Sequence, residues 1–308
     1  MKLANGNLVI TNNILIVHLI LTQPCHHINH NTIYEAYHSQ YSLESLSTPL
    51  VMRLLQFDSD GRLSLNEFWN DTPPYAILSH TWGANEVLFQ DIVNGTAKSK
   101  DGYVKVEFLA QKAAERGLRH FWIDTCCIDK SSSLELQTAI NSMFRWYRDA
   151  AVCFVYMADV FSGPERGNST TSWEVAFSTS RWFGRGWTLQ ELLAPTSVEF
   201  FSAGIGAPLG DKQSLERHII EITGIPVNAL RGQNLHSFSI DERMRWAQNR
   251  KTTREEDEAY SLMGLFDVFI PILYGEGKQR AFERLREEID KRSKRPSSSK
   301  GNFCLHSR

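Results

Sequence analysis

The hydrophobic pattern from Met52 onwards alternates between strand-like and helix-like segments. Two short apolar runs, Tyr75–Ser79 and Phe121–Asp124, end in polar residues, which is typical of buried strands. Apolar residues recur at helical spacing between these runs and again after them. The first helical set comprises Val104, Phe108 and Ala114, and the second comprises Ile140, Met143, Phe144 and Tyr147. This order predicts a parallel sheet with helices on both faces.

The alternation continues to about residue 202. Ala151–Met157 is a third predicted strand, and a loop rich in Gly, Ser and Thr follows over Ser162–Ser172. Trp187–Leu193 reads as a short helix that ends before Pro195, and Val198–Phe201 reads as a fourth strand. Ligand sites in such sheets lie beyond the carboxyl ends of the strands. We therefore predict an α/β domain over residues 52–202.

The rest of the chain follows other patterns. Residues 203–292 are predicted to be a helical extension, since Leu215, Ile219 and Ile222 share one face and Phe282, Leu285 and Ile289 share another. The tail, 293–308, is rich in Lys, Arg and Ser and is expected to be disordered. Residues 1–51 have few charges and no sustained period. We interpret them as an appendage or a gene-model artefact, with Met52 as a candidate translation start.

Composition excludes several classes of function. The 33 Lys and Arg residues against 35 Asp and Glu residues leave no basic excess for nucleic-acid binding. No apolar stretch approaches the roughly 20 residues that a membrane helix needs. Five cysteines, an odd number, do not suggest a secreted disulfide framework. A cytoplasmic protein without membrane or nucleic-acid partners is expected.

Three motifs are better explained by structure than by chemistry. Gln56–Glu67 partly matches a calcium loop, but position 1 is not Asp, and Asp60-Gly61 predicts a turn between two strands. The histidines near Cys25 lack the spacing of a zinc site, so no metal is expected. Cys126 and Cys127 follow a strand, where a thiolate could act with His80 or His120 as base. Buried small side chains are the favoured interpretation of this pair.

Glu191 is the most informative acidic residue. It follows Trp187 by one helical turn, so the carboxylate and the indole share a helix face. A carboxylate beside an aromatic wall can stabilise the oxocarbenium-like charge that forms when nicotinamide leaves NAD. The alternative is a surface or capping glutamate paired with Arg181 or Arg185, and spacing alone favours that alternative.

Four sequence blocks resemble the fungal heterokaryon incompatibility (HET) domain. They occur in the order of that family and cover Met52 to about Ile289. The blocks are Tyr75–Gly83 (YAILSHTWG), Phe121–Lys130 (FWIDTCCIDK), Arg181–Pro195 (RWFGRGWTLQELLAP) and Thr253–Gly264 (TREEDEAYSLMG). The resemblance implies a role in nonself recognition when hyphae fuse, ending in programmed cell death. It also implies partners: self-association, or other HET or nucleotide-binding incompatibility proteins.

A second resemblance is to TIR domains. Their first strand ends in a serine and a loop, as Leu78-Ser79 does, and Trp187 to Leu192 is similar in spacing to their Trp-x-x-x-Glu helix. Thr188 stands where plant TIR domains usually have cysteine. In TIR enzymes this glutamate cleaves NAD, so the resemblance implies a catalytic role for Glu191, with NAD as substrate and no required cofactor. The resemblance also implies that the α/β domain over residues 52–202 is of flavodoxin-like type.

Two mechanisms remain open at this point. In the first, NAD binds near Ser79, Trp82, Asp124 and Glu191, and Trp82 or Trp187 stacks on a ring. The chain is then an NAD glycohydrolase, and loss of NAD kills the cell. In the second, the domain signals by assembling with like domains. Its motif residues then act in packing and in satisfying buried polar groups.

Overall fold

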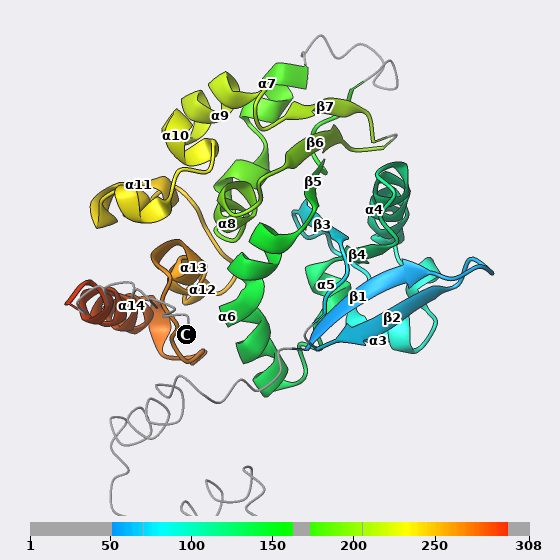
Figure 1. The fold of residues 1–308 in the computed structure, drawn as a ribbon, viewed down its shortest axis with the longest axis horizontal. Coiled ribbons are helices and arrows are strands. Elements are labelled where there is room, and N and C mark those ends of the chain that lie inside the picture. Colours follow the sequence, from blue (N-terminus) through cyan, green and yellow to red (C-terminus); the bar gives the residue numbers. More distant parts are fainter. Residues whose placement is uncertain (1–50, 70, 163–172, 205, 295–308) are drawn as a thin grey trace, which may run out of the picture. The chain divides into compact units, whose positions relative to one another are not determined.

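The computed structural model describes residues 51–69, 71–162, 173–204 and 206–294, which belong to one compact unit. Its sheet has seven strands in the order β2-β1-β4-β3-β5-β6-β7 (Figure 1). The strands are β1 Met52–Phe57, β2 Leu63–Phe68, β3 Tyr75–His80, β4 His120–Trp122, β5 Val152–Met157, β6 Val198–Ser202 and β7 Pro208–Asp211. Residues 1–50 of the appendage, most of the predicted 162–172 loop and residues 295–308 of the tail lie outside the described residues.

The four central strands, β4, β3, β5 and β6, are parallel. Numbered along the chain, their order is 2-1-3-4, as in doubly wound sheets. The α/β class is therefore confirmed. The sheet as a whole is mixed, because β7 runs antiparallel to β6 and the β1–β2 hairpin extends the other edge with antiparallel pairing. The flavodoxin-like type is thus not confirmed for the complete sheet.

Helices cover both faces of the central strands. All six residues of β3 and of β5 are buried, as expected for strands covered on both sides. Figure 1 shows α4 on one side of these strands and α6 and α8 on the other. The helix that carries Glu191 is α8 Thr188–Leu193, and the longest helices are α4 Tyr103–Glu115, α6 Ser133–Asp149, α9 Glu216–Thr223, α11 Ile240–Ala247 and α14 Gly277–Lys294. The shorter ones are α3 Phe89–Val93, α5 Asp124–Cys127, α7 Trp173–Ser178, α10 Val227–Leu230, α12 Asp257–Tyr260, α13 Met263–Phe266 and the 3-10 turns η1 Ala97–Ser99, η2 Arg181–Gly184 and η3 Leu235–Ser237.

The calcium-like spacing at residues 56–67 belongs to a hairpin. The Asp58 carboxylate accepts hydrogen bonds from the backbone N–H groups of Asp60 and Arg62, at 2.9 and 2.8 Å. Gly61 has a φ of 72°, a conformation that glycine adopts without steric cost. The chain then pairs β1 with β2 in antiparallel register. The predicted turn between two strands is confirmed.

Three local predictions need correction. Pro208–Asp211 is a strand, not part of a helical region, because it pairs with the edge strand β6. Such a short segment carries no period of its own. Val104 is 44% exposed, since the buried face of α4 is formed by its neighbours Tyr103, Val106 and Leu109. The helix α14 continues to Lys294, beyond the expected boundary at 292. None of the helices in the described ranges combines the length and hydrophobicity that a bilayer span requires.

Candidate functional site

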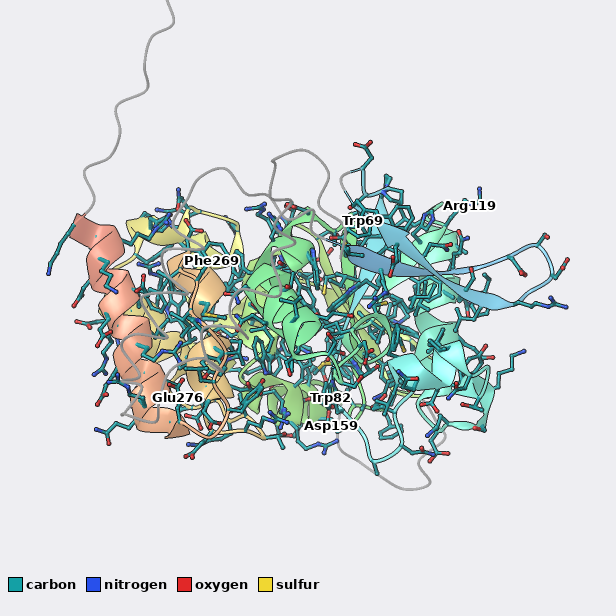
Figure 2. All side chains as sticks on the ribbon, turned by 90° about the horizontal axis from the view of Figure 1, so that it is seen from below. Trp69, Trp82, Arg119, Asp159, Phe269 and Glu276 are labelled. Carbon is teal, nitrogen blue, oxygen red and sulfur yellow. The ribbon has the colours of Figure 1, made fainter. Side chains whose placement is uncertain are left out.

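The candidate site lies at the carboxyl end of β3. The chain leaves β3 for β4 on one side and reaches β5 on the other, so this end is the switch point of the parallel strands, where ligands bind in open α/β sheets. Ser79 and His80 are the last two residues of β3, and their side chains point to opposite faces. Figure 2 shows Trp82, which follows β3, and Asp159, which follows β5, on the same margin of the molecule.

Glu191 reaches this end of the sheet from α8. Its carboxylate accepts a hydrogen bond from the Ser79 hydroxyl. The same hydroxyl oxygen accepts a bond of 2.8 Å from the Trp182 indole N–H. On the same face the Tyr147 hydroxyl, which acts on the pKa of Glu191, donates its proton to the Leu78 carbonyl at 2.8 Å. Because Glu191 is 7% exposed and Ser79 and Trp182 are fully buried, these groups form an interior polar cluster.

The carboxyl of Glu191 is an unusually weak acid. Burial raises its pKa to about 8, and the negative charge of Asp124 acts in the same direction. Hydrogen bonds from Ser79 and Tyr147 and the charge of Arg250 lower the pKa, but they do not outweigh burial. At neutral pH most Glu191 carboxyls are therefore protonated.

Arg250 is the cation whose charge acts on Glu191. It is 4% exposed, and burial lowers its pKa to about 10. Its Nη1 donates to the Thr188 hydroxyl at 2.8 Å and to the Arg185 carbonyl at 3.0 Å. The guanidinium thereby holds the first residue of α8, the helix that carries Glu191.

Asp159 positions Trp182 although sequence analysis did not identify it. Its carboxylate accepts hydrogen bonds from the Ser180 hydroxyl at 2.7 Å and from the Arg181 backbone N–H at 2.8 Å. These bonds hold the start of η2, which carries Trp182. The available signal was its position just beyond the third predicted strand, next to β3 in the sheet.

Asp124 is the centre of a second cluster at the same edge. Its Oδ1 lies 3.0 Å from His80 Nε2, and its Oδ2 accepts a bond of 3.0 Å from the Trp82 indole. Lys130 Nζ is 3.7 Å from Oδ2 and 3.7 Å from the centre of the Trp82 ring. Trp82 is 50% exposed, so this cluster presents an aromatic face to solvent.

Buried charges support the Asp124 cluster from behind. Lys105 Nζ lies 3.1 Å from His80 Nδ1, donates to the Thr81 carbonyl at 3.1 Å and pairs with Glu86. Since an ammonium can only donate, Nδ1 of His80 is the acceptor and Nε2–H donates to Asp124. Sequence analysis missed Lys105 and Glu86, because no motif connects them to the strand end.

The Asp124 carboxyl is a strong acid in this setting. Burial opposes its ionisation, but the charge of Lys130 and hydrogen bonds from His80 and Trp82 hold its pKa well below the usual range. Asp124 is therefore ionised at neutral pH, whereas most of Glu191 is not. One strand end thus holds two carboxyl groups of opposite protonation preference, a pattern that divides roles between acids in enzymes.

Of the predicted site residues, the structure joins Ser79 to Glu191 and Trp82 to Asp124, while Trp187 lies apart from these contacts. The Trp187 indole donates to Asp257 of α12, at 3.4 Å. The arginines considered as partners of Glu191 also bond elsewhere. Arg181 pairs with Asp159, and Arg185 donates to Thr253. Glu191 is therefore an interior side chain rather than a surface glutamate.

The paired cysteines are structural. Cys126 and Cys127 are buried, and burial raises the pKa of both thiols, that of Cys126 to about 12. Burial keeps both thiols protonated and away from solvent, which agrees with the favoured interpretation of the pair as buried small side chains. In the part of the chain that the structure describes, no group of three or more His, Cys, Asp or Glu side chains is arranged to hold a metal ion. The histidines near Cys25 lie outside that part.

Comparison with known proteins gives a consistent family. Residues 75–166 match the family model described as Heterokaryon incompatibility protein (HET). The chain is 56% identical over 244 residues to Vegetative incompatibility protein HET-E-1 of Podospora anserina. That match covers 78% of this chain but 18% of the relative, so the chain spans less than a fifth of the curated relative it matches. No solved structure matches the chain.

Proposed function

This chain is a HET domain protein, and from that premise we propose that it acts in heterokaryon incompatibility by cleaving NAD at the carboxyl end of β3. The observation that carries the proposal is the hydrogen bond between Ser79 and Glu191. It supports the site predicted from the TIR resemblance, because it brings the implied catalytic carboxyl to the switch point of the sheet. The proposal places the protein in the cytoplasm, acting by self-association or with other incompatibility proteins.

The exposed Asp124 cluster is suited to bind the substrate. Trp82 offers a ring face on which a base can stack, and Lys130 adds positive charge beside it for an anionic pyrophosphate. Asp124 has lone pairs left for a ribose hydroxyl, as acidic residues do in other parallel-sheet nucleotide sites. Trp82 and Asp124 are accessible in the free protein, whereas the Lys130 ammonium is buried and acts on the anion through its charge rather than by direct contact.

Glu191 is assigned the chemical step. The bond between the ribose C1′ and the nicotinamide nitrogen breaks, and its electron pair neutralises the positive ring. The resulting ribosyl cation is stabilised by the Glu191 carboxylate. Water then adds its oxygen to C1′ and releases a proton, which gives ADP-ribose, nicotinamide and H⁺. The cationic ring of bound NAD favours the ionised form of a carboxyl whose pKa is about 8 in the free protein.

Access to Glu191 requires a conformational change, because the side chain is 7% exposed. We assign that opening to assembly of the domains, which couples catalysis to recognition. On this account the monomer does not cleave NAD, and the oligomer does.

The test is an inducible expression experiment in a fungal host, with the full chain as wild type, Glu191→Gln and Glu221→Gln at matched protein level. Glu221 is the control because it makes a surface pair with Arg217 on α9. Wild type and Glu221→Gln are expected to deplete NAD before growth stops, and Glu191→Gln is expected to do neither. Growth arrest by all three proteins with NAD unchanged would rule out the enzymatic mechanism.

Assembly without catalysis is the second candidate, and burial is the observation that favours it. Ser79, Trp182 and Glu191 satisfy one another's hydrogen bonds without a ligand, as interior packing residues do. On this account the motifs maintain the fold, and signalling depends on contacts between domains. Glu191→Gln would then arrest growth as wild type does, with constant NAD and unchanged oligomer size in gel filtration.

A further inference from the structure

Arg250 also lines a cavity of about 450 Å³ that the proposed function does not use. The cavity lies among α11, the α12–α13 region and α14. Apolar side chains form part of its wall, namely Met244, Ala247, Leu262 and Phe282. Cations form another part, namely Arg245, Arg250, Lys278 and Arg286. Its volume is within the range of small-molecule sites.

The charges of this cavity do not balance. Its two acids are Asp241 and Glu258, against four cations. Glu258 forms an ion pair with Lys278, whose Nζ lies 2.5 Å from Oε2. Among the described residues, Arg245, Arg250 and Arg286 form no ion pair. The cavity therefore combines an apolar wall with three guanidinium groups that lack a carboxylate partner.

Arg250 adds a hydrogen-bond donor without an acceptor. Its Nη1 bonds to Thr188 and Arg185, and its Nε donates to the Trp246 carbonyl at 3.4 Å. Its Nη2 is buried and has no hydrogen-bond partner in the part of the chain that the structure describes. A buried donor without an acceptor costs free energy, and an acceptor supplied by a ligand would remove that cost.

We propose that this cavity binds a small organic anion with an apolar body and a carboxylate or phosphate head. The head is bound by the guanidinium groups, whose forked donors match both kinds of anion. The body packs on Met244, Leu262 and Phe282. A ligand without the anionic head leaves the guanidinium groups without an acceptor, and a ligand without the apolar body leaves the apolar wall without a packing partner.

Occupancy is coupled to the first site through Arg250. Arg250, which lines this cavity, donates to Thr188 at the start of α8, and Glu191 lies on that helix. A ligand that immobilises Arg250 therefore also immobilises the helix that carries the carboxyl. This consequence rests on the proposed function, whereas binding itself does not.

The test is titration calorimetry on the full chain with four probes: octyl phosphate, octanoate, inorganic phosphate and octanol. At least one of the two amphipathic anions is expected to bind with one-to-one stoichiometry and more tightly than inorganic phosphate or octanol. Comparison of the two anions then shows whether the site prefers a phosphate or a carboxylate head. NAD cleavage is not part of the readout, so its absence leaves this result intact.

Two variants locate the binding site. Ala247→Leu fills the apolar part, and Arg286→Gln removes an exposed guanidinium from the rim. Arg286→Gln is expected to weaken binding by about tenfold, the size of one lost charge-assisted contact, and Ala247→Leu is expected to weaken it because the larger side chain occupies space that the apolar body needs. Arg280→Gln is the control on the same helix, since Arg280 pairs with Glu283 and does not line the cavity. Circular dichroism verifies that all three variants fold.

Three results would overturn the inference. The first is no binding of octyl phosphate or octanoate at millimolar concentration. The second is octanol or inorganic phosphate binding as tightly as both amphipathic anions, because one half of the cavity then suffices. The third is unchanged affinity in folded Ala247→Leu, because the probe then binds elsewhere.

Discussion

Ser79 and Glu191 are 112 positions apart in the chain and share a buried hydrogen bond at the carboxyl end of β3. The Ser79 oxygen also accepts the indole N–H of Trp182. One hydroxyl group therefore connects the central strand, η2 and α8.

Ser79→Ala is expected to destabilise the fold by about 1–3 kcal/mol, because it leaves the buried Trp182 N–H without its acceptor. The pKa of Glu191 is expected to rise further, since the bond from Ser79 lowers it. Urea unfolding measures the loss of stability. Ser59→Ala, an exposed position in the β1–β2 turn, is the control and is expected to be neutral. Equal stability of the two variants would contradict a structural role for the Ser79 hydroxyl.

The stability of the protein is expected to fall as the pH rises towards 8, in a manner that depends on Glu191. Burial raises the pKa of this carboxyl from 4.5 to about 8, so between these values the folded protein binds a proton that the unfolded chain has lost. Unfolding therefore releases a proton and becomes easier with rising pH. Wild type should lose several kcal/mol relative to Glu191→Gln over this range. Urea unfolding of both proteins across the interval measures the difference, and parallel pH profiles would contradict an elevated pKa.

The stabilising effect of Asp124 is expected to depend on pH in the opposite sense to that of Glu191, and Asp124→Asn removes it. The pKa of Asp124 is held below its ordinary value, so its stabilising effect is present above about pH 4 and is lost as the pH falls towards the folded pKa. The variant should be less stable than wild type at neutral pH, by about 1–3 kcal/mol, with a smaller gap in acid. Thermal unfolding of wild type and of the variant, at neutral pH and in acid, measures the two differences in stability. Asp101→Asn, on the surface, is the control, and a gap that widens in acid would show the sign to be wrong.

Gly264→Ala is expected to be strongly destabilising. A Cβ at this position of α13 would overlap the Cβ and ring atoms of Phe144 on α6. Such overpacking costs typically about 1–3 kcal/mol or more. Gly184→Ala is the matched control, because a Cβ there meets nothing within 4 Å. Phe144→Gly, which removes the Cβ nearest to the added methyl group as well as the ring, should rescue part of the loss in a double-mutant cycle, and additive effects of the two substitutions would contradict the contact.

Several elements could be predicted from local pattern alone. The strands β3 and β5 are buried on both faces, and the apolar runs of their residues indicate this directly. The Asp60-Gly61 turn is likewise local, because backbone groups within four residues complete it. β7 carries no such signal, since its pairing with β6 comes from tertiary contact.

Some residues of the candidate site could likewise be predicted from the sequence, and others could not. Sequence blocks identified Ser79, Trp82, Asp124 and Glu191 as a group, because each follows or faces a predicted strand end. Their partners were not predictable. Lys105 and Asp159 join the site through contacts across 25 and 21 positions, which no sequence period encodes. Trp187 was grouped with Glu191 by helical spacing, yet its indole bonds to Asp257, 70 positions away.

The sequence by itself determined the family, the α/β class and the residues at the strand ends, because these depend on local composition and on motif spacing. Only the tertiary structure decided the protonation of the two carboxyl groups. Glu191 and Asp124 are similar acids in an unfolded chain. Their pKa values separate because burial outweighs the hydrogen bonds and the charge of Arg250 at Glu191, whereas Lys130 and the hydrogen bonds from His80 and Trp82 outweigh burial at Asp124. Burial and neighbouring charge are properties of the folded arrangement, which local sequence does not contain.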